Sequence, residues 1–168
     1  MNKNEMEIDK KEIRPITNIL GLAILDSQRM EYNIAFMMLL VNDELNFTNR
    51  EHDEKIDNYM LNLSKKTLGT LIRQLKKLIN VSDEFSERLE EALEARNYLT
   101  HRFFNHQGEN LLTIKGRKEA LELVKEKREL LYQCIYFLDP FIQTLMKLRG
   151  FAPEIFTDEV SGKYEREE

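Results

Sequence analysis

An arginine lies where a helix would bury its side chain. Between positions 83 and 104, apolar residues recur at helical spacing, forming a stripe of Phe85, Leu89, Ala92, Leu99 and Phe103. Arg96 lies in the middle of that stripe. A guanidinium stays charged in proteins, so on an apolar face it requires a carboxylate, backbone carbonyls or an anionic ligand. Asp26 and Asp139 also lie in apolar stretches, and each could form an ion pair with Arg96. An anionic ligand is the other interpretation.

Two polar residues follow at the border of the stripe. Asn97 and His101 are four residues apart and therefore share a helix face. A histidine exchanges its proton near neutral pH, which suits a general acid or base; the alternative is a half-exposed polar residue near a helix end. On a regular helix this face lies roughly 100 to 140° from Arg96, so the Arg96 and His101 side chains should diverge. His106 is expected to be a solvated loop residue.

The segment Arg96-Asn97-Tyr98-Leu99-Thr100-His101 resembles the signature of HEPN domains, in which an Arg and a polar residue precede a His. The resemblance implies a helical bundle that cleaves RNA without a metal or another cofactor. The 2′-hydroxyl of the RNA would attack the phosphate and leave a 2′,3′-cyclic phosphate. Arg96 would bind the phosphate oxygens, His101 would act as general acid or base, and Asn97 would orient one of them.

The resemblance also implies partners. HEPN nucleases form homodimers that bring two motifs to one cleft, which would offset the predicted divergence of Arg96 and His101. Many are toxins or phage-defence effectors of prokaryotes, so an antitoxin or a nucleotidyltransferase is a possible partner. In one branch, a Tyr two residues after the motif His is the site of an AMPylation that inactivates the nuclease. Phe103 occupies that position here, so this control is not expected.

Basic residues are concentrated around the motif. Between Ser64 and Lys118 there are 11 Lys and Arg against 7 Asp and Glu, whereas the whole chain carries a net charge of -5. This distribution favours a local RNA track over a broad nucleic-acid-binding surface. The residues predicted to bind RNA are Lys66, Arg73, Lys77, Arg102, Lys115, Arg117 and Lys118. The alternative is that they are ordinary solvated helix faces.

The elements that must position these residues are all helical, because apolar residues recur every three or four positions and no stretch alternates with period two. Four helices are predicted. The first begins after Pro15 and ends at about residue 42, and the second covers 53–80 with a break near 63–67. The third covers 83–104, and the last begins near Arg117. Pro140 should kink the last helix, and Gly150 should end it. Residues 105–116 should form a loop. The predicted fold is an antiparallel bundle of four to five helices.

Length and composition set the wider limits. The 168 residues, 42% hydrophobic and 33% charged, predict one domain over residues 1–150 and an acidic, loosely ordered tail over 151–168. The lone Cys134 allows no internal disulfide or Cys-rich zinc site and points to a reducing compartment. With neither a secretory signal nor a membrane span expected, the predicted location is cytoplasmic. A catalytically silent HEPN-like adaptor is the main alternative, and a small transcriptional repressor is a weaker one.

Overall fold

The computed structural model describes residues 10–47 and 53–151, and within these ranges all regular structure is helical. The long helices are α2 (Lys10–Leu40) and α7 (Ile114–Leu148). Between them lie α3 (Asp53–Ser64), α4 (Leu68–Leu78), α5 (Asp83–Asn97), a π-helical turn (Tyr98–Arg102), α6 (Phe103–Gln107) and a 3-10 turn (Asn110–Leu112). The all-α prediction is confirmed. The predicted tail, apart from its first residue, lies outside the described residues.

Local signals account for several helix ends. Ser82 caps α5, because its hydroxyl accepts a hydrogen bond from the Phe85 amide at 3.2 Å. Thr67 caps α4 in the same way after the predicted break. Gly150 ends α7 with a φ of 81°, and the amides of Gly150 and Phe151 donate to the carbonyls of Lys147 and Met146. The predicted break and the predicted stop at Gly150 are therefore confirmed.

Two helix starts differ from the sequence prediction, whereas α7 continues past Pro140 to its predicted end. α2 begins at Lys10, five residues before Pro15. α7 also begins at Ile114, ahead of Arg117, because the Thr113 hydroxyl accepts a hydrogen bond from the Gly116 amide at 2.9 Å. The predicted loop over 105–116 is thus mostly helical turns. Gly116 allows the 3-10 turn to approach, since a Cβ there would lie 2.2 Å from the Asn110 carbonyl oxygen.

The chain forms two compact units, and α2 and α7 each contribute to both. The first unit holds the chain up to Glu31 together with Val81–Tyr136, and so contains the whole predicted motif. Its core includes Ala23, Met30, Leu89, Ala92, Leu99, Val124, Leu131 and Ile135. Cys134 also lies in this core, and burial raises the pKa of its thiol to about 12.

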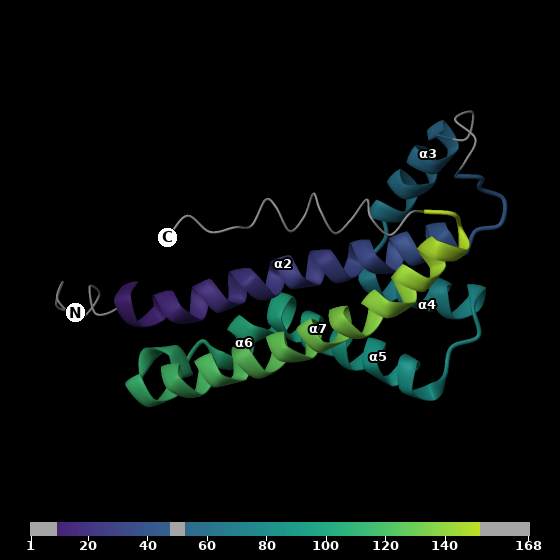
Figure 1. Ribbon diagram of the computed structural model, residues 1–168. Helices are drawn as coiled ribbons and strands as arrows, with labels where there is room; N and C mark the ends of the chain where they lie inside the picture. The colour runs from purple at the N-terminus through teal and green to yellow at the C-terminus, as the bar shows by residue number, and fades with distance from the viewer. Residues whose placement is uncertain (1–9, 48–52, 152–168) are drawn as a thin grey trace, which may run out of the picture. The chain divides into compact units, whose positions relative to one another are not determined.

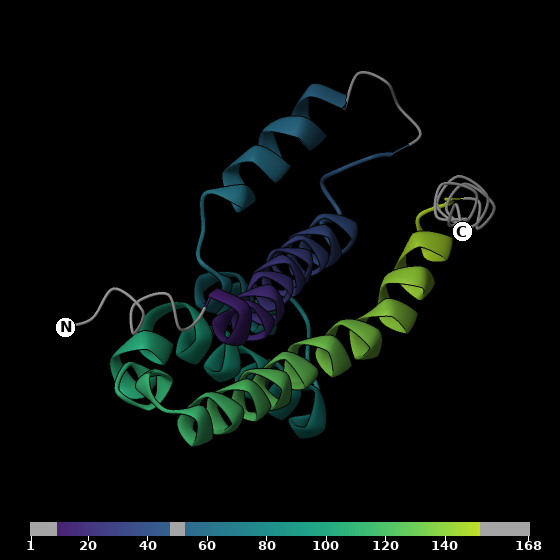
Figure 2. The same ribbon diagram turned by 90° about the vertical axis from the view of Figure 1, so that its left-hand side faces the viewer.

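Within the first unit, α2 and α7 lie side by side and run in the same direction, as Figure 1 shows and the turned view in Figure 2 agrees. An ion pair joins them, with Arg128 Nε donating to Asp26 at 2.7 Å. α5 runs the opposite way (Figure 1). The predicted antiparallel arrangement therefore applies to α5 but not to the pair α2 and α7, which are not consecutive in the chain and so are not held antiparallel by a short loop.

The second unit holds Tyr32–Asn80 and the chain from Phe137 onward. One face of α4 is buried in its core through Leu68, Leu71, Ile72 and Leu75. Arg149 ties the end of α7 to the end of α2, since its guanidinium donates to the Leu40 carbonyl and to Asp43. Among the described residues, no helix is long and apolar enough to span a bilayer.

Candidate functional site

The predicted motif lies on an irregular helical segment. α5 ends at Asn97, and the five residues Tyr98–Arg102 form a π-helical turn in which the Phe103 amide donates to the Tyr98 carbonyl. A π turn holds one residue more than an α-helical turn. His101 therefore lies on the same side of the helix as Arg96. On a regular helix, the fourth residue after Arg96 would take that place. Such turns are frequent at functional sites.

This turn brings the three motif side chains together within one chain. Arg96 Nη1 lies 3.2 Å from Nε2 of His101 and donates to Oδ1 of Asn97, also at 3.2 Å. Because a guanidinium can only donate, Nε2 of His101 is the acceptor in this contact. The expectation that Arg96 and His101 diverge is wrong, because it assumed a regular helix through His101. A second copy is not needed to bring these two side chains together.

An unpredicted carboxylate completes the cluster. Arg96 Nη2 donates to Oε1 of Glu31 on α2 at 3.2 Å, and the two side chains are 22% and 29% exposed. The proposed ion-pair partners were Asp26 and Asp139, but Asp26 pairs with Arg128 and Asp139 belongs to the other unit. Nε of Arg96 is buried and has no hydrogen-bond partner. The guanidinium thus divides its outer N–H groups among a carboxylate, an amide oxygen and an imidazole.

Aromatic and basic groups lie beside the motif. Gln107 donates to the Tyr98 hydroxyl at 3.1 Å, and His106 packs edge-on against the Tyr98 ring with centroids 5.6 Å apart. His106 is therefore part of α6 and contacts the motif segment, although a solvated loop position was expected. The Arg102 guanidinium lies 5.8 Å from the centre of the Tyr98 ring and forms an ion pair with Glu94. Phe103, which replaces the modifiable Tyr, is buried.

The residues predicted to bind RNA fall in both units. Lys66, Arg73 and Lys77 belong to the second unit, where Lys66 donates to Gln74 at 2.8 Å. In the first unit Lys115 and Lys118 are exposed, and Arg102 is partly exposed. Arg117 is only 7% exposed, and its Nη1 donates to the Leu111 carbonyl at 2.9 Å, so it supports the turn before α7.

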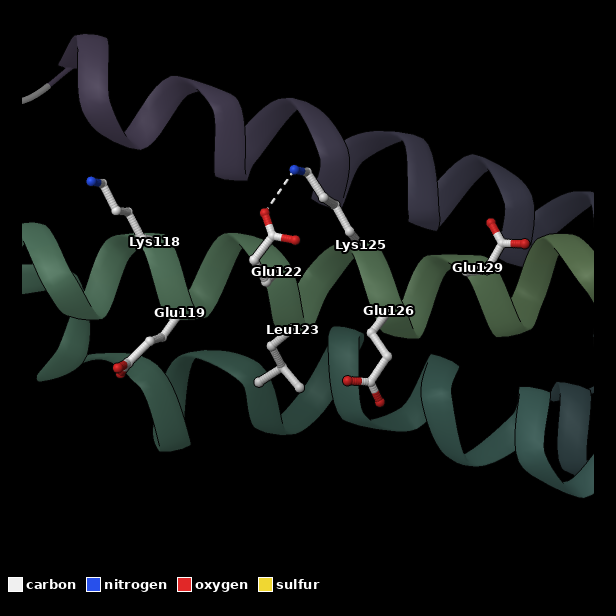
Figure 3. A pocket seen from close by; sticks show the side chains of 7 residues that line it. All are labelled: Lys118, Glu119, Glu122, Leu123, Lys125, Glu126 and Glu129. Atoms are coloured by element: carbon white, nitrogen blue, oxygen red, sulfur yellow. Dashed lines mark hydrogen bonds and ion pairs between the residues drawn. The ribbon is translucent and has the colours of Figure 1, made fainter.

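Two grooves of the first unit lie away from the motif. One follows the exposed side of α7 and is lined by charged residues around Leu123, as Figure 3 shows. Another lies beside Ile19 of α2 and Tyr132 of α7. Arg96, Asn97 and His101 line neither groove. Over residues 10–47 and 53–151, no group of three or more metal-ligating side chains comes together.

Sequence reasoning missed Glu31 and the π turn. A signal for Glu31 exists in the sequence, because the residues three and four positions after it, Ile34 and Ala35, are apolar. A carboxylate at that spacing lies at the edge of an apolar helix face. A search of protein-family profiles, curated proteins and solved structures found no match to this chain.

Proposed function

We propose that this protein is a metal-independent endoribonuclease of the HEPN type, acting as a homodimer in the role of a toxin or phage-defence effector. The observation that carries the proposal is the convergence of Arg96, Asn97 and His101, with Arg96 Nη1 at 3.2 Å from both neighbours. A cation and a proton-exchanging imidazole at one point are the two groups that phosphodiester transfer requires of a protein. RNA, an antitoxin and a nucleotidyltransferase remain the proposed partners.

RNA brings its own nucleophile, so the protein has only to move protons and stabilise charge. In the proposed reaction the 2′-hydroxyl attacks the adjacent phosphorus, and the bond to the 5′ oxygen breaks. The imidazole of His101 takes the proton of the 2′-hydroxyl as general base or protonates the leaving 5′ oxygen as general acid, and water accepts or supplies the other proton. The Nη1 hydrogens of Arg96, which now point to His101 and Asn97, would turn to the nonbridging oxygens as their charge grows. The products are a 2′,3′-cyclic phosphate and a 5′-hydroxyl.

A catalytically silent adaptor is the second proposal, and the Arg96–Glu31 ion pair favours it. At 22% and 29% exposure the two side chains neutralise each other on the flank of the core. In that interpretation Arg96 fastens α5 to α2 and the position of His101 has no chemical role. The two proposals differ in what the loss of His101 does.

The test is the variant His101→Ala, assayed on single-stranded RNA in EDTA. Loss of an acid–base group should reduce the cleavage rate by about a hundredfold or more. The melting temperature should change little, because His101 is exposed. The matched control is His106→Ala, which removes the neighbouring exposed imidazole and should keep most of the activity.

Product analysis completes this test. Fragments ending in a cyclic phosphate resist phosphatase until acid opens the ring, which identifies attack by the 2′-hydroxyl. Cleavage that depends on an added divalent metal would contradict the mechanism. A protein unfolded by Arg96→Ala and unaffected by His101→Ala would support the adaptor.

A further inference from the structure

The exposed face of α7 carries a regular row of side chains. Six exposed residues of the first unit are spaced alternately by four and three positions: Lys118, Glu122, Lys125, Glu129, Tyr132 and Tyr136. This spacing places them on one narrow stripe of the helix, as at the seam of a coiled coil. In Figure 3 the four charged members extend from the same side of α7.

The charges along this row are complementary to those of a second copy of the row that runs in the opposite direction. The row reads Lys118, Glu122, Lys125, Glu129, so its signs alternate, and its midpoint lies between Glu122 and Lys125. If a second α7 lay antiparallel across that midpoint, Lys118 would face Glu129 of the other copy, and Glu122 would face Lys125. Every one of these contacts joins opposite charges, and a two-fold axis repeats each of them.

We propose that this α7 stripe is a homodimer interface, with the α7 helices of two copies packed antiparallel about a two-fold axis. The orientation follows from the charges, because a parallel, in-register pair would place each charge against its own kind. The homodimer itself belongs to the proposed function, whereas the choice of surface rests only on the charges of α7.

Neighbouring contacts support this arrangement. The same axis sets Lys115 opposite Tyr132 of the other copy, where an ammonium can lie over the ring. Tyr132 and Tyr136 contact each other, with ring centroids 4.6 Å apart and hydroxyl oxygens at 2.7 Å. Lys125 Nζ now donates to Glu122 within the chain at 2.8 Å. On assembly each of these two side chains would acquire a second partner of opposite sign.

Two residues of the row form a pair that can arise only between copies. Lys118 and Glu129 are eleven residues apart, which is about 16 Å along a helix, so they cannot contact each other in one copy. In the variants Lys118→Glu and Glu129→Lys, like charges would meet twice in each dimer. Each variant should raise the Kd of the dimer by about tenfold or more. Both positions are exposed, so the variants should fold as the original protein does.

The decisive measurement is sedimentation velocity over a concentration series up to about 100 µM, where a dimer of micromolar Kd is formed. The original protein should pass from a 20.0 kDa species to one of twice that mass, and added salt should reverse this. A mixture of the two single variants should form a heterodimer, since all of its contacts again join opposite charges. The double variant should restore self-association. Glu91→Lys on α5 is the charge-matched control and should leave the dimer intact.

Three results would overturn the α7 interface: a monomer throughout the series, dimers of the single variants as strong as the original, or a mixture that does not associate. RNA cleavage is measured separately. A dimer that obeys these charge rules without cleaving RNA contradicts the ribonuclease and leaves the interface standing. Cleavage by a protein that stays monomeric contradicts the interface and leaves the motif chemistry standing.

Discussion

Two arginines of the first unit reach α2 and contact carboxylates there, but they use their guanidinium groups differently. Arg128 donates from Nε to Asp26 at 2.7 Å, and Asp26 is only 15% exposed. Arg96 meets Glu31 at 3.2 Å with Nη2, and its Nη1 is shared between Asn97 and His101. The first contact is shorter, whereas the second is longer and branched. The two pairs are similarly exposed, with Arg128 at 30% and Asp26 at 15%, against 22% for Arg96 and 29% for Glu31.

This difference indicates which arginine fastens helices and which could act on a ligand. A short charge-assisted hydrogen bond contributes to holding α2 against α7. An arginine that divides its donors among three weaker contacts can exchange them for the oxygens of a phosphate at less cost. Proximity to an exposed imidazole adds a second reactive group only at Arg96. The comparison therefore favours a stabilising role for Arg128 and leaves Arg96 as the arginine better placed to contact a ligand.

The largest expected effect comes from replacing Arg96 with lysine, with Arg128→Lys as the matched comparison. Arg96→Lys keeps the positive charge but loses the planar fork that contacts Asn97, His101 and Glu31 together. If the ribonuclease proposal holds, cleavage should fall by about a hundredfold or more, as measured by single-turnover kinetics on labelled RNA. Arg128→Lys should keep the rate within about twofold. Equal losses in both variants would contradict the division of roles.

Much of the fold follows from sequence because its signals are local. Apolar spacing, the caps at Ser82 and Thr67, and the glycine at 150 each act within one helical turn, and the structure contains all of them. The direction of α7 relative to α2 was not predictable in the same way. Their packing depends on contacts between residues about a hundred positions apart, such as Asp26 and Arg128.

The candidate site was predicted in its residues but not in its geometry. Arg96, Asn97 and His101 were identified from residue type and spacing, yet an ideal helix places Arg96 and His101 apart. The π turn that joins them is a choice between two helical hydrogen-bond patterns, and residue type and spacing alone do not settle that choice. Glu31 lies 65 residues before Arg96, too far along the chain for spacing alone to pair them.

A smaller effect is expected from truncating the carboxylates. Asp26→Ala leaves Arg128 without its short contact to a carboxylate that is only 15% exposed, and should lower the free energy of unfolding by about 1 to 3 kcal/mol. Glu31→Ala leaves Arg96 with Asn97 and His101, so the loss should stay below about 1 kcal/mol. Thermal melts should separate the variants by several degrees, since 1 kcal/mol shifts a protein of this size by about 2 to 4 °C.

The alkylation rate of Cys134 provides an independent measurement of the difference in stability between Asp26→Ala and Glu31→Ala. Its thiol is 2% exposed, and burial raises its pKa to about 12, so at pH 8 the folded protein holds it protonated and inaccessible. Alkylation should then proceed only through opening of the unit. Asp26→Ala should accelerate it by about tenfold for each 1.4 kcal/mol lost, and Glu31→Ala should change it much less. Alkylation of the original protein at the rate of a free thiol would contradict this account.

The smallest effect on stability is expected at a third arginine, which extends the comparison to the surface. Arg102 is 40% exposed and pairs with Glu94, which is 67% exposed, so Arg102→Gln should change the free energy of unfolding by less than about 1 kcal/mol. If Arg102 contacts RNA, the variant should bind more weakly, and the slope of log affinity against log salt should fall by about 1. Glu91→Gln on α5 serves as the neutralising control. An unchanged salt slope would remove Arg102 from the RNA track while leaving the roles of Arg96 and Arg128 as they are.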